Sequence, residues 1–87
     1  MSLFEQITII GLGHIGSSLA RVIRNKNLTQ RLVAADISPE VCAAVKRLGL
    51  AHTETTDIAA SVMNSDLVIV CVPVGATRKV AEAIGPM

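Results

Sequence analysis

Near the start of the chain, a short apolar run leads directly into three closely spaced glycines: Ile7-Thr8-Ile9-Ile10-Gly11-Leu12-Gly13-His14-Ile15-Gly16. The β-branched residues 7–10 predict a buried strand. An apolar stripe at helical spacing follows and predicts a helix to about residue 25: Ile15, Leu19, Val22 and Ile23. Three glycines in this spacing between a strand and a helix predict a dinucleotide-binding turn. Gly11 allows the tight turn, Gly13 lets a pyrophosphate approach the backbone, and Gly16 lets the helix pack closely.

An acidic residue stands twenty positions after the last of these glycines. Residues 31–36 predict a second strand that ends at Asp36. Its carboxylate would accept hydrogen bonds from ribose hydroxyls, each worth about 1.5–3 kcal/mol. It would repel a 2′-phosphate, and neither Ile37 nor Ser38 offers a compensating cation, so we expect NAD rather than NADP. The alternative is that the glycines only form a tight turn and that Asp36 caps the loop before the next helix.

The middle of the chain predicts a capped helix. Ser38 is the expected N-cap and Pro39 the first helical residue, and Gly49 is the expected stop. The expected buried stripe of this helix consists of Val41, Val45 and Leu48.

The remaining elements complete an alternating pattern. A short strand over 51–54 and a weak helix over 57–63, capped by Asp57, precede a strong apolar strand over 67–72 and a helix over 76–84. Alternating strands and helices predict an α/β Rossmann-type parallel sheet of strand order 3-2-1-4 with flanking helices. We expect residues 1–87 to be a partial NAD(P)-binding domain, truncated after the fourth strand and its helix, without a substrate or dimerisation domain. An unpaired edge on the fourth strand would favour self-association.

Further candidates follow from this topology. The segment after the fourth strand lies where the strand order reverses, so we expect the backbone of Cys71 to Pro73 to line the cofactor and Thr77 to reach it. An equal alternative is that Pro73 only terminates the strand. The candidate cofactor-binding residues are therefore Gly11, Gly13, His14, Ile15, Gly16, Asp36, Cys71, Val72, Pro73 and Thr77. No residue is expected to be catalytic or to bind a metal.

Four polar side chains remain to be interpreted. His14 either contacts a phosphate or, as we favour, points to solvent while its backbone amide binds. Ser17 and Ser18 either reach a phosphate or bond to their own backbone. His52 is expected to be an ordinary surface histidine.

Composition narrows the class of protein. The 87 residues are 51% hydrophobic with one aromatic, Phe4, and carry a formal net charge of +1, which argues against disorder and against nucleic-acid or membrane-surface partners. Four neighbouring basic residues are expected on a solvated helix face and end: Arg21, Arg24, Lys26 and Arg31. The two cysteines lack paired spacing, as in a reduced cytoplasmic protein. No signal peptide or bilayer-spanning run is visible.

Three segments resemble prephenate and arogenate dehydrogenases. They are residues 7–20, Asp36-Ile37-Ser38-Pro39-Glu40, and residues 66–77 with Val72-Pro73-Val74-Gly75-Ala76-Thr77. The last segment is the most specific of the three, because the glycine turn is shared with many dehydrogenases. His14 departs from the apolar residue usual at its position in this family.

The resemblance implies a role in tyrosine biosynthesis. Enzymes of this family oxidatively decarboxylate prephenate to 4-hydroxyphenylpyruvate, or arogenate to tyrosine, and pass a hydride to NAD(P). The resemblance implies that Gly11, Gly13, Gly16 and Asp36 bind the dinucleotide. It also implies that the family's catalytic histidine, substrate-binding arginine and dimer-forming helical domain have no counterpart here, with a homodimer expected for the full-length enzyme. The alternatives are a β-hydroxyacid or phosphogluconate-type dehydrogenase and a non-catalytic nucleotide-sensing module.

Overall fold

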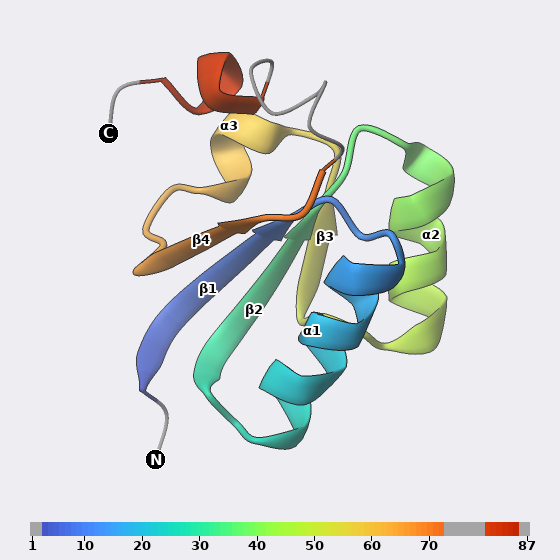
Figure 1. Cartoon of the computed structure of the whole chain (residues 1–87), viewed down its shortest axis with the longest axis vertical. Helices are drawn as coiled ribbons and strands as arrows, with labels where there is room; N and C mark the ends of the chain where they lie inside the picture. Colours follow the sequence, from blue (N-terminus) through green and yellow to red (C-terminus); the bar gives the residue numbers. More distant parts are fainter. Residues whose placement is uncertain (1–2, 73–79, 86–87) are drawn as a thin grey trace.

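The chain forms a parallel sheet of four strands in the order β3-β2-β1-β4, as predicted (Figure 1). The structure is a computed structural model that describes residues 3–72 and 80–85. The elements are β1 (Phe4–Ile10), α1 (His14–Asn25), β2 (Thr29–Ala35), α2 (Pro39–Leu48), β3 (Thr53–Thr55), α3 (Ile58–Ser61) and β4 (Leu67–Val70). Residues 80–84 are also helical, and the first part of the helix predicted over 76–84 lies outside the described residues.

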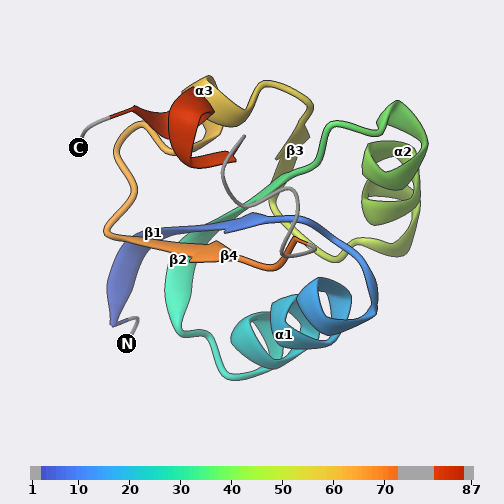
Figure 2. The same ribbon diagram turned by 45° about the horizontal axis from the view of Figure 1, so that its top comes forward.

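Both faces of the sheet are covered, which explains its continuous apolar strands. Figure 2 shows α1 on one face, and α3 with the helical residues 80–84 on the other. One apolar cluster joins α1 and α2 to β1 and β2 through Ala20, Val45, Ile9 and Leu32. The second cluster joins α3 and residues 80–84 to β1 and β4. The sheet is therefore the middle layer of three.

The predicted helix stripes were partly wrong. In α1 the buried residues are Gly16, Ala20 and Ile23, whereas Ile15 is 77% and Val22 is 47% exposed. Because Gly16 has to face the sheet at close range, the helix is rotated so that Ile15 points to solvent. In α2 the predicted Val45 is buried beside Cys42, but Leu48 is 56% exposed.

The predicted helix caps at Ser38, Gly49 and Asp57 are confirmed, although α3 ends at Ser61 rather than at residue 63. The Ser38 hydroxyl accepts a hydrogen bond from the Val41 amide at 3.3 Å, and α2 ends at Gly49. Asp57 caps α3 by accepting a hydrogen bond from the Ala60 amide at 3.0 Å. Short polar side chains at these positions satisfy amides that have no partner inside a helix.

The two cysteines differ in their surroundings. Cys42 is buried, and burial raises the pKa of its thiol. Cys71 is only half-buried and directly follows β4. Its amide donates to the Ile10 carbonyl at 2.7 Å, so the contact between β1 and β4 continues for one residue past the strand.

The two edges of the described sheet differ in chemistry. β3 has three polar residues, whereas β4 reads Leu-Val-Ile-Val, with Leu67 38% and Val70 41% exposed. Self-association through β4 stays a prediction. None of the helices in the described part of the chain has the length and apolar character needed to cross a membrane.

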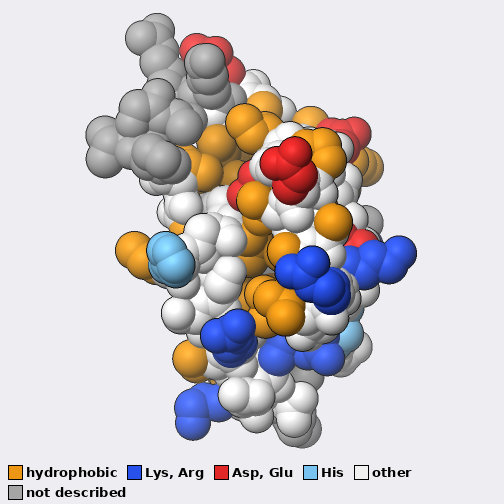
Figure 3. Space-filling model, turned by 90° about the vertical axis from the view of Figure 1, so that its right-hand side faces the viewer, with side chains coloured by type: hydrophobic (Ala, Val, Ile, Leu, Met, Phe, Trp, Pro, Cys, Tyr) orange, Lys and Arg blue, Asp and Glu red, His pale blue; other side chains and the backbone are white. Residues whose placement is uncertain are grey.

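One of the four neighbouring basic residues, Arg21, lines a hollow together with Gly13 and His14 of the glycine turn. Arg21, Arg24, Lys26 and Arg31 are all exposed, which agrees with a solvated helix face and end. Figure 3 shows Lys and Arg side chains gathered on the lower half of one face and acidic side chains mostly above them.

His52 lies on the surface, as predicted, and its ring also makes a structural hydrogen bond. Its Nδ1 accepts a hydrogen bond from the Leu32 amide at 2.8 Å, and its own amide donates to the Leu32 carbonyl at 2.9 Å. The side chain thus acts as an acceptor for β2, just before β3 begins. Partial burial of the ring lowers the pKa of His52 below its ordinary 6.5, and the positive charge of Arg24 has a smaller effect in the same direction.

We predict that His52 makes the chain less stable in acid. The folded state favours the neutral ring, so the unfolded chain binds a proton at higher pH than the folded chain. The free energy of unfolding should therefore fall as the pH drops from 7.5 through 6.5 to 5.5. His52→Asn keeps an acceptor near the Nδ1 position without titrating, and it should lose this dependence in urea unfolding. His14→Asn changes the only other histidine and should keep it. An equal pH slope in His52→Asn and wild type would contradict the assignment.

Candidate nucleotide-binding site

The described residues of the predicted site gather at the carboxyl ends of the strands. Because β1, β2 and β4 are parallel, the segments that follow them lie next to one another. The glycine turn leaves β1 for α1, Asp36 follows β2, and Cys71 and Val72 follow β4 (Figure 1). The strand order reverses between β1 and β4. Open α/β sheets bind ligands at such a reversal.

Two of the three glycines are required by the fold itself. Gly11 has φ +92°, and a Cβ on it would lie 2.6 Å from the Cys71 carbonyl oxygen and 2.8 Å from Val72 Cγ1. A Cβ on Gly16 would overlap the Gly11 carbonyl oxygen. The end of β1, the start of α1 and the segment after β4 can approach so closely only without side chains at these two positions.

Gly13 differs from both of them. Its φ of −70° is accessible to any residue, and no described atom lies within 4 Å of a Cβ built on it. The described part of the fold therefore gives no steric reason for glycine here. A bare backbone in open space is what a bound pyrophosphate needs.

The start of α1 offers free backbone donors. Gly13 is the N-cap, no side chain of the described residues caps the helix, and its first turn contains no acidic residue. The amides of His14, Ile15 and Gly16 have no acceptor within the helix, and they carry the positive end of its dipole. The side chains of His14 and Ile15 are exposed. This arrangement suits an anion bound by backbone amides.

Asp36 lies beside the turn and holds it. Its Oδ2 accepts a hydrogen bond from the Leu12 amide at 3.0 Å, and its Oδ1 accepts one from the Ser38 amide at 3.0 Å. The alternative role, in which Asp36 caps the loop before α2, is therefore real. The carboxylate is only half-buried and has further lone pairs for a ligand.

Ser17 bonds to its own backbone. Its hydroxyl donates to the Leu12 carbonyl at 3.0 Å, which is one of the two alternatives left open by the sequence. The turn is thus held by Asp36 on one side and by Ser17 on the other.

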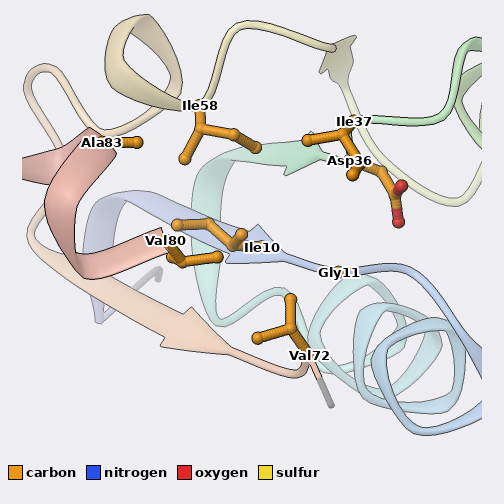
Figure 4. A pocket seen from close by; sticks show the side chains of 8 residues that line it. All are labelled: Ile10, Gly11, Asp36, Ile37, Ile58, Val72, Val80 and Ala83. Atoms are coloured by element: carbon orange, nitrogen blue, oxygen red, sulfur yellow. The ribbon is translucent and has the colours of Figure 1, made fainter. Parts of the chain in front are cut away.

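An apolar cavity of about 170 Å³ adjoins the turn and Asp36 (Figure 4). Pockets for whole drug-sized ligands measure about 300–1,000 Å³, so this one suits a single ring system. Its lining residues are Ile10, Gly11, Asp36, Ile37, Ile58, Val72, Val80 and Ala83.

Sequence reasoning missed five of these lining residues, one of which is Ile10, the last residue of β1. Ile58, Val80 and Ala83 come from helices far away in sequence, and only the tertiary structure brings them to β1. The sequence could have indicated Ile37, because it is an apolar residue directly after Asp36. The structure shows that it is 80% exposed.

A second hollow of about 600 Å³ brings together five predicted residues with Val70: Gly13, His14, Ile15, Cys71 and Val72. Val72 lines both hollows. The two therefore flank the turn, as a ligand with two rings joined by a central anion would require. The predicted Pro73 and Thr77 lie outside the described residues, so their roles stay predictions.

Comparison with known proteins agrees with this geometry. Residues 19–87 match the family model "Prephenate dehydrogenase, nucleotide-binding domain". The chain is 41% identical over 86 residues to the cyclohexadienyl dehydrogenase of Zymomonas mobilis, covering 99% of this chain and 29% of that protein. It is 30% identical over 80 residues to the prephenate dehydrogenase of Bacillus subtilis, covering 92% of this chain and 22% of that protein.

A solved structure is similar as well. The prephenate dehydrogenase from A. aeolicus, in complex with hydroxyphenyl propionate and NAD⁺, superimposes with a TM-score of 0.83 at 28% identity. That match covers 92% of this chain and 28% of the other. The chain thus spans between about a fifth and a third of the length of these relatives. From the family match and the site geometry together, the chain belongs to the nucleotide-binding domain family of prephenate dehydrogenases.

Proposed function

We propose that this chain binds NAD, in preference to NADP, as the cofactor-binding part of a dehydrogenase that oxidatively decarboxylates prephenate or arogenate. The observation that carries the proposal is the bare, open backbone at Gly13 beside the uncapped start of α1. In the proposed complex the pyrophosphate lies against the amides of residues 14–16. The apolar cavity beside Asp36 takes the adenine.

Asp36 supports the preference for NAD. Its free lone pairs can accept hydrogen bonds from the ribose hydroxyls. A 2′-phosphate at about 4 Å would be repelled by about 4 kcal/mol per charge pair at an effective dielectric of 20. The exposed residue that follows, Ile37, brings no positive charge.

Bound NAD would supply the hydride acceptor for the reaction. The residues of this chain bind and orient the cofactor. We propose that the groups that act on the substrate, and those that form a homodimer, belong to the part of the relatives that this chain does not span. The family match favours this function over the phosphogluconate-type and nucleotide-sensing alternatives.

The glycines allow binding to be separated from folding. We predict that Gly13→Ala stays within about 1 kcal/mol of the wild-type stability, because a less mobile unfolded chain offsets a poorer helix cap. NAD affinity should fall about tenfold or more, since a methyl group would occupy the space of the pyrophosphate. Gly16→Ala should instead lose about 3 kcal/mol of stability, because its methyl meets a backbone oxygen.

Urea unfolding and calorimetric titration with NAD measure the two effects in parallel. If a folded Gly13→Ala chain bound NAD with wild-type affinity, the proposed pyrophosphate site would be contradicted.

Asp36 should set the choice of dinucleotide. We expect the wild-type chain to bind NAD about tenfold or more tightly than NADP. Asp36→Asn should narrow that ratio by strengthening NADP binding and weakening NAD binding. Glu40→Gln removes a nearby exposed acid in the first turn of α2 and should leave the ratio unchanged. Parallel titrations with both dinucleotides measure the ratio of NAD to NADP affinity. An unaltered ratio in Asp36→Asn would refute the role of the carboxylate.

The catalytic part of the proposal needs a longer protein that carries this chain. Such a protein, given NAD with prephenate or with arogenate, should form NADH, which is followed by its absorbance. If NAD binds but neither substrate yields NADH, the chain belongs to the nucleotide-sensing class or to another dehydrogenase.

A further inference from the structure

We propose that Asp36 and Ser17 position the glycine turn through Leu12, so that Asp36 contributes to nucleotide affinity beyond its contact with the ribose. This inference rests on the proposed function. It assigns a second role to Asp36 and a positioning role to Ser17, whose side chain need not touch the ligand.

The amide, the carbonyl and the side chain of Leu12 each have a partner in the fold. Its amide donates to Asp36 Oδ2 at 3.0 Å, and its carbonyl accepts from the Ser17 hydroxyl at 3.0 Å. Its side chain is 5% exposed and packs in the cluster between α1, α2 and the sheet. The residues that follow, 13–15, are exposed. The turn is therefore fixed immediately before the backbone that would meet the pyrophosphate.

The two side chains hold Leu12 from different elements. Asp36 follows β2, and its second oxygen binds the Ser38 amide at the start of α2. Ser17 lies in the second turn of α1, and its own amide donates to the Gly13 carbonyl at 2.9 Å. The ends of β1 and β2 and the starts of α1 and α2 are thus joined through Leu12 and Asp36.

Such a fixed turn lowers the cost of binding. A backbone that is already ordered loses less freedom when a ligand arrives, so affinity depends on the residues that order it. The carboxylate serves both roles at once, because two of its roughly four acceptor positions are used by amides.

A ligand without ribose hydroxyls separates the two roles. ADP keeps the hydroxyls, whereas 2′,3′-dideoxy-ADP lacks them and keeps the diphosphate. If the inference holds, Asp36→Ala weakens the binding of dideoxy-ADP by about three- to tenfold and that of ADP by more. Ser17→Ala should weaken both ligands by the same factor, and Ser17→Thr should restore both.

Asp57→Ala is the matched control, because Asp57 also accepts a backbone amide at the start of a helix, 3.0 Å from Ala60 N. It should leave both affinities unchanged. Hydrogen exchange of the Leu12 amide without ligand should be faster in Asp36→Ala and Ser17→Ala than in Asp57→Ala. This measurement also reports on a variant that binds too weakly to titrate.

The outcomes are distinguishable. Unchanged dideoxy-ADP affinity in Asp36→Ala, together with weaker ADP binding, would mean that Asp36 acts through the ribose alone and would overturn the inference while leaving the proposed function intact. A wild-type chain that bound neither ADP nor NAD would overturn the proposed function, and this inference with it.

Discussion

The close contact between the first turn of α1 and the end of β1 controls the rest of the domain. Gly16 faces the Gly11 carbonyl so closely that a Cβ would overlap it. This contact sets the rotation of α1, which places Ala20 and Ile23 in the core and turns Ile15 to solvent. One steric constraint therefore determines the packing of the helix. Among the described residues, no side chain caps the amides at the start of α1, because the N-cap is Gly13.

Polar groups then fix the turn that the glycines permit. Asp36 and Ser17 bind the amide and the carbonyl of Leu12, while its side chain joins the core. A turn rich in glycine would otherwise be costly to order. In the proposed complex, the negative charge of Asp36 beside the positive end of α1 would direct the phosphates to the amides and the ribose hydroxyls to the carboxylate.

The site lies where the strand order reverses, between β1 and β4. This position explains why segments from several strands and helices line it. On one side, the segment after β2 contributes Asp36 and Ile37; on the other, β4 leads into Cys71 and Val72. α3 and the helical residues 80–84 cover the sheet face there and add Ile58 and Val80 to the apolar cavity. A domain of this design binds and orients a cofactor, and in the proposed enzyme the substrate meets it from another part of the protein.

The amino-acid sequence alone predicted the strand order, the helix caps at Ser38 and Asp57, the glycine turn and the position of Asp36. These features depend on local rules of spacing, capping and backbone conformation, which leave their mark in a few neighbouring residues. Only the tertiary structure decided which side of α1 is buried, because Gly16 contacts a backbone atom that no hydrophobic pattern records. It also decided the bond from the Leu32 amide to His52, and the cavity that joins Ile37 to Ile58 and Val80. Those contacts join segments far apart along the chain, and they form only when the sheet brings the segments together.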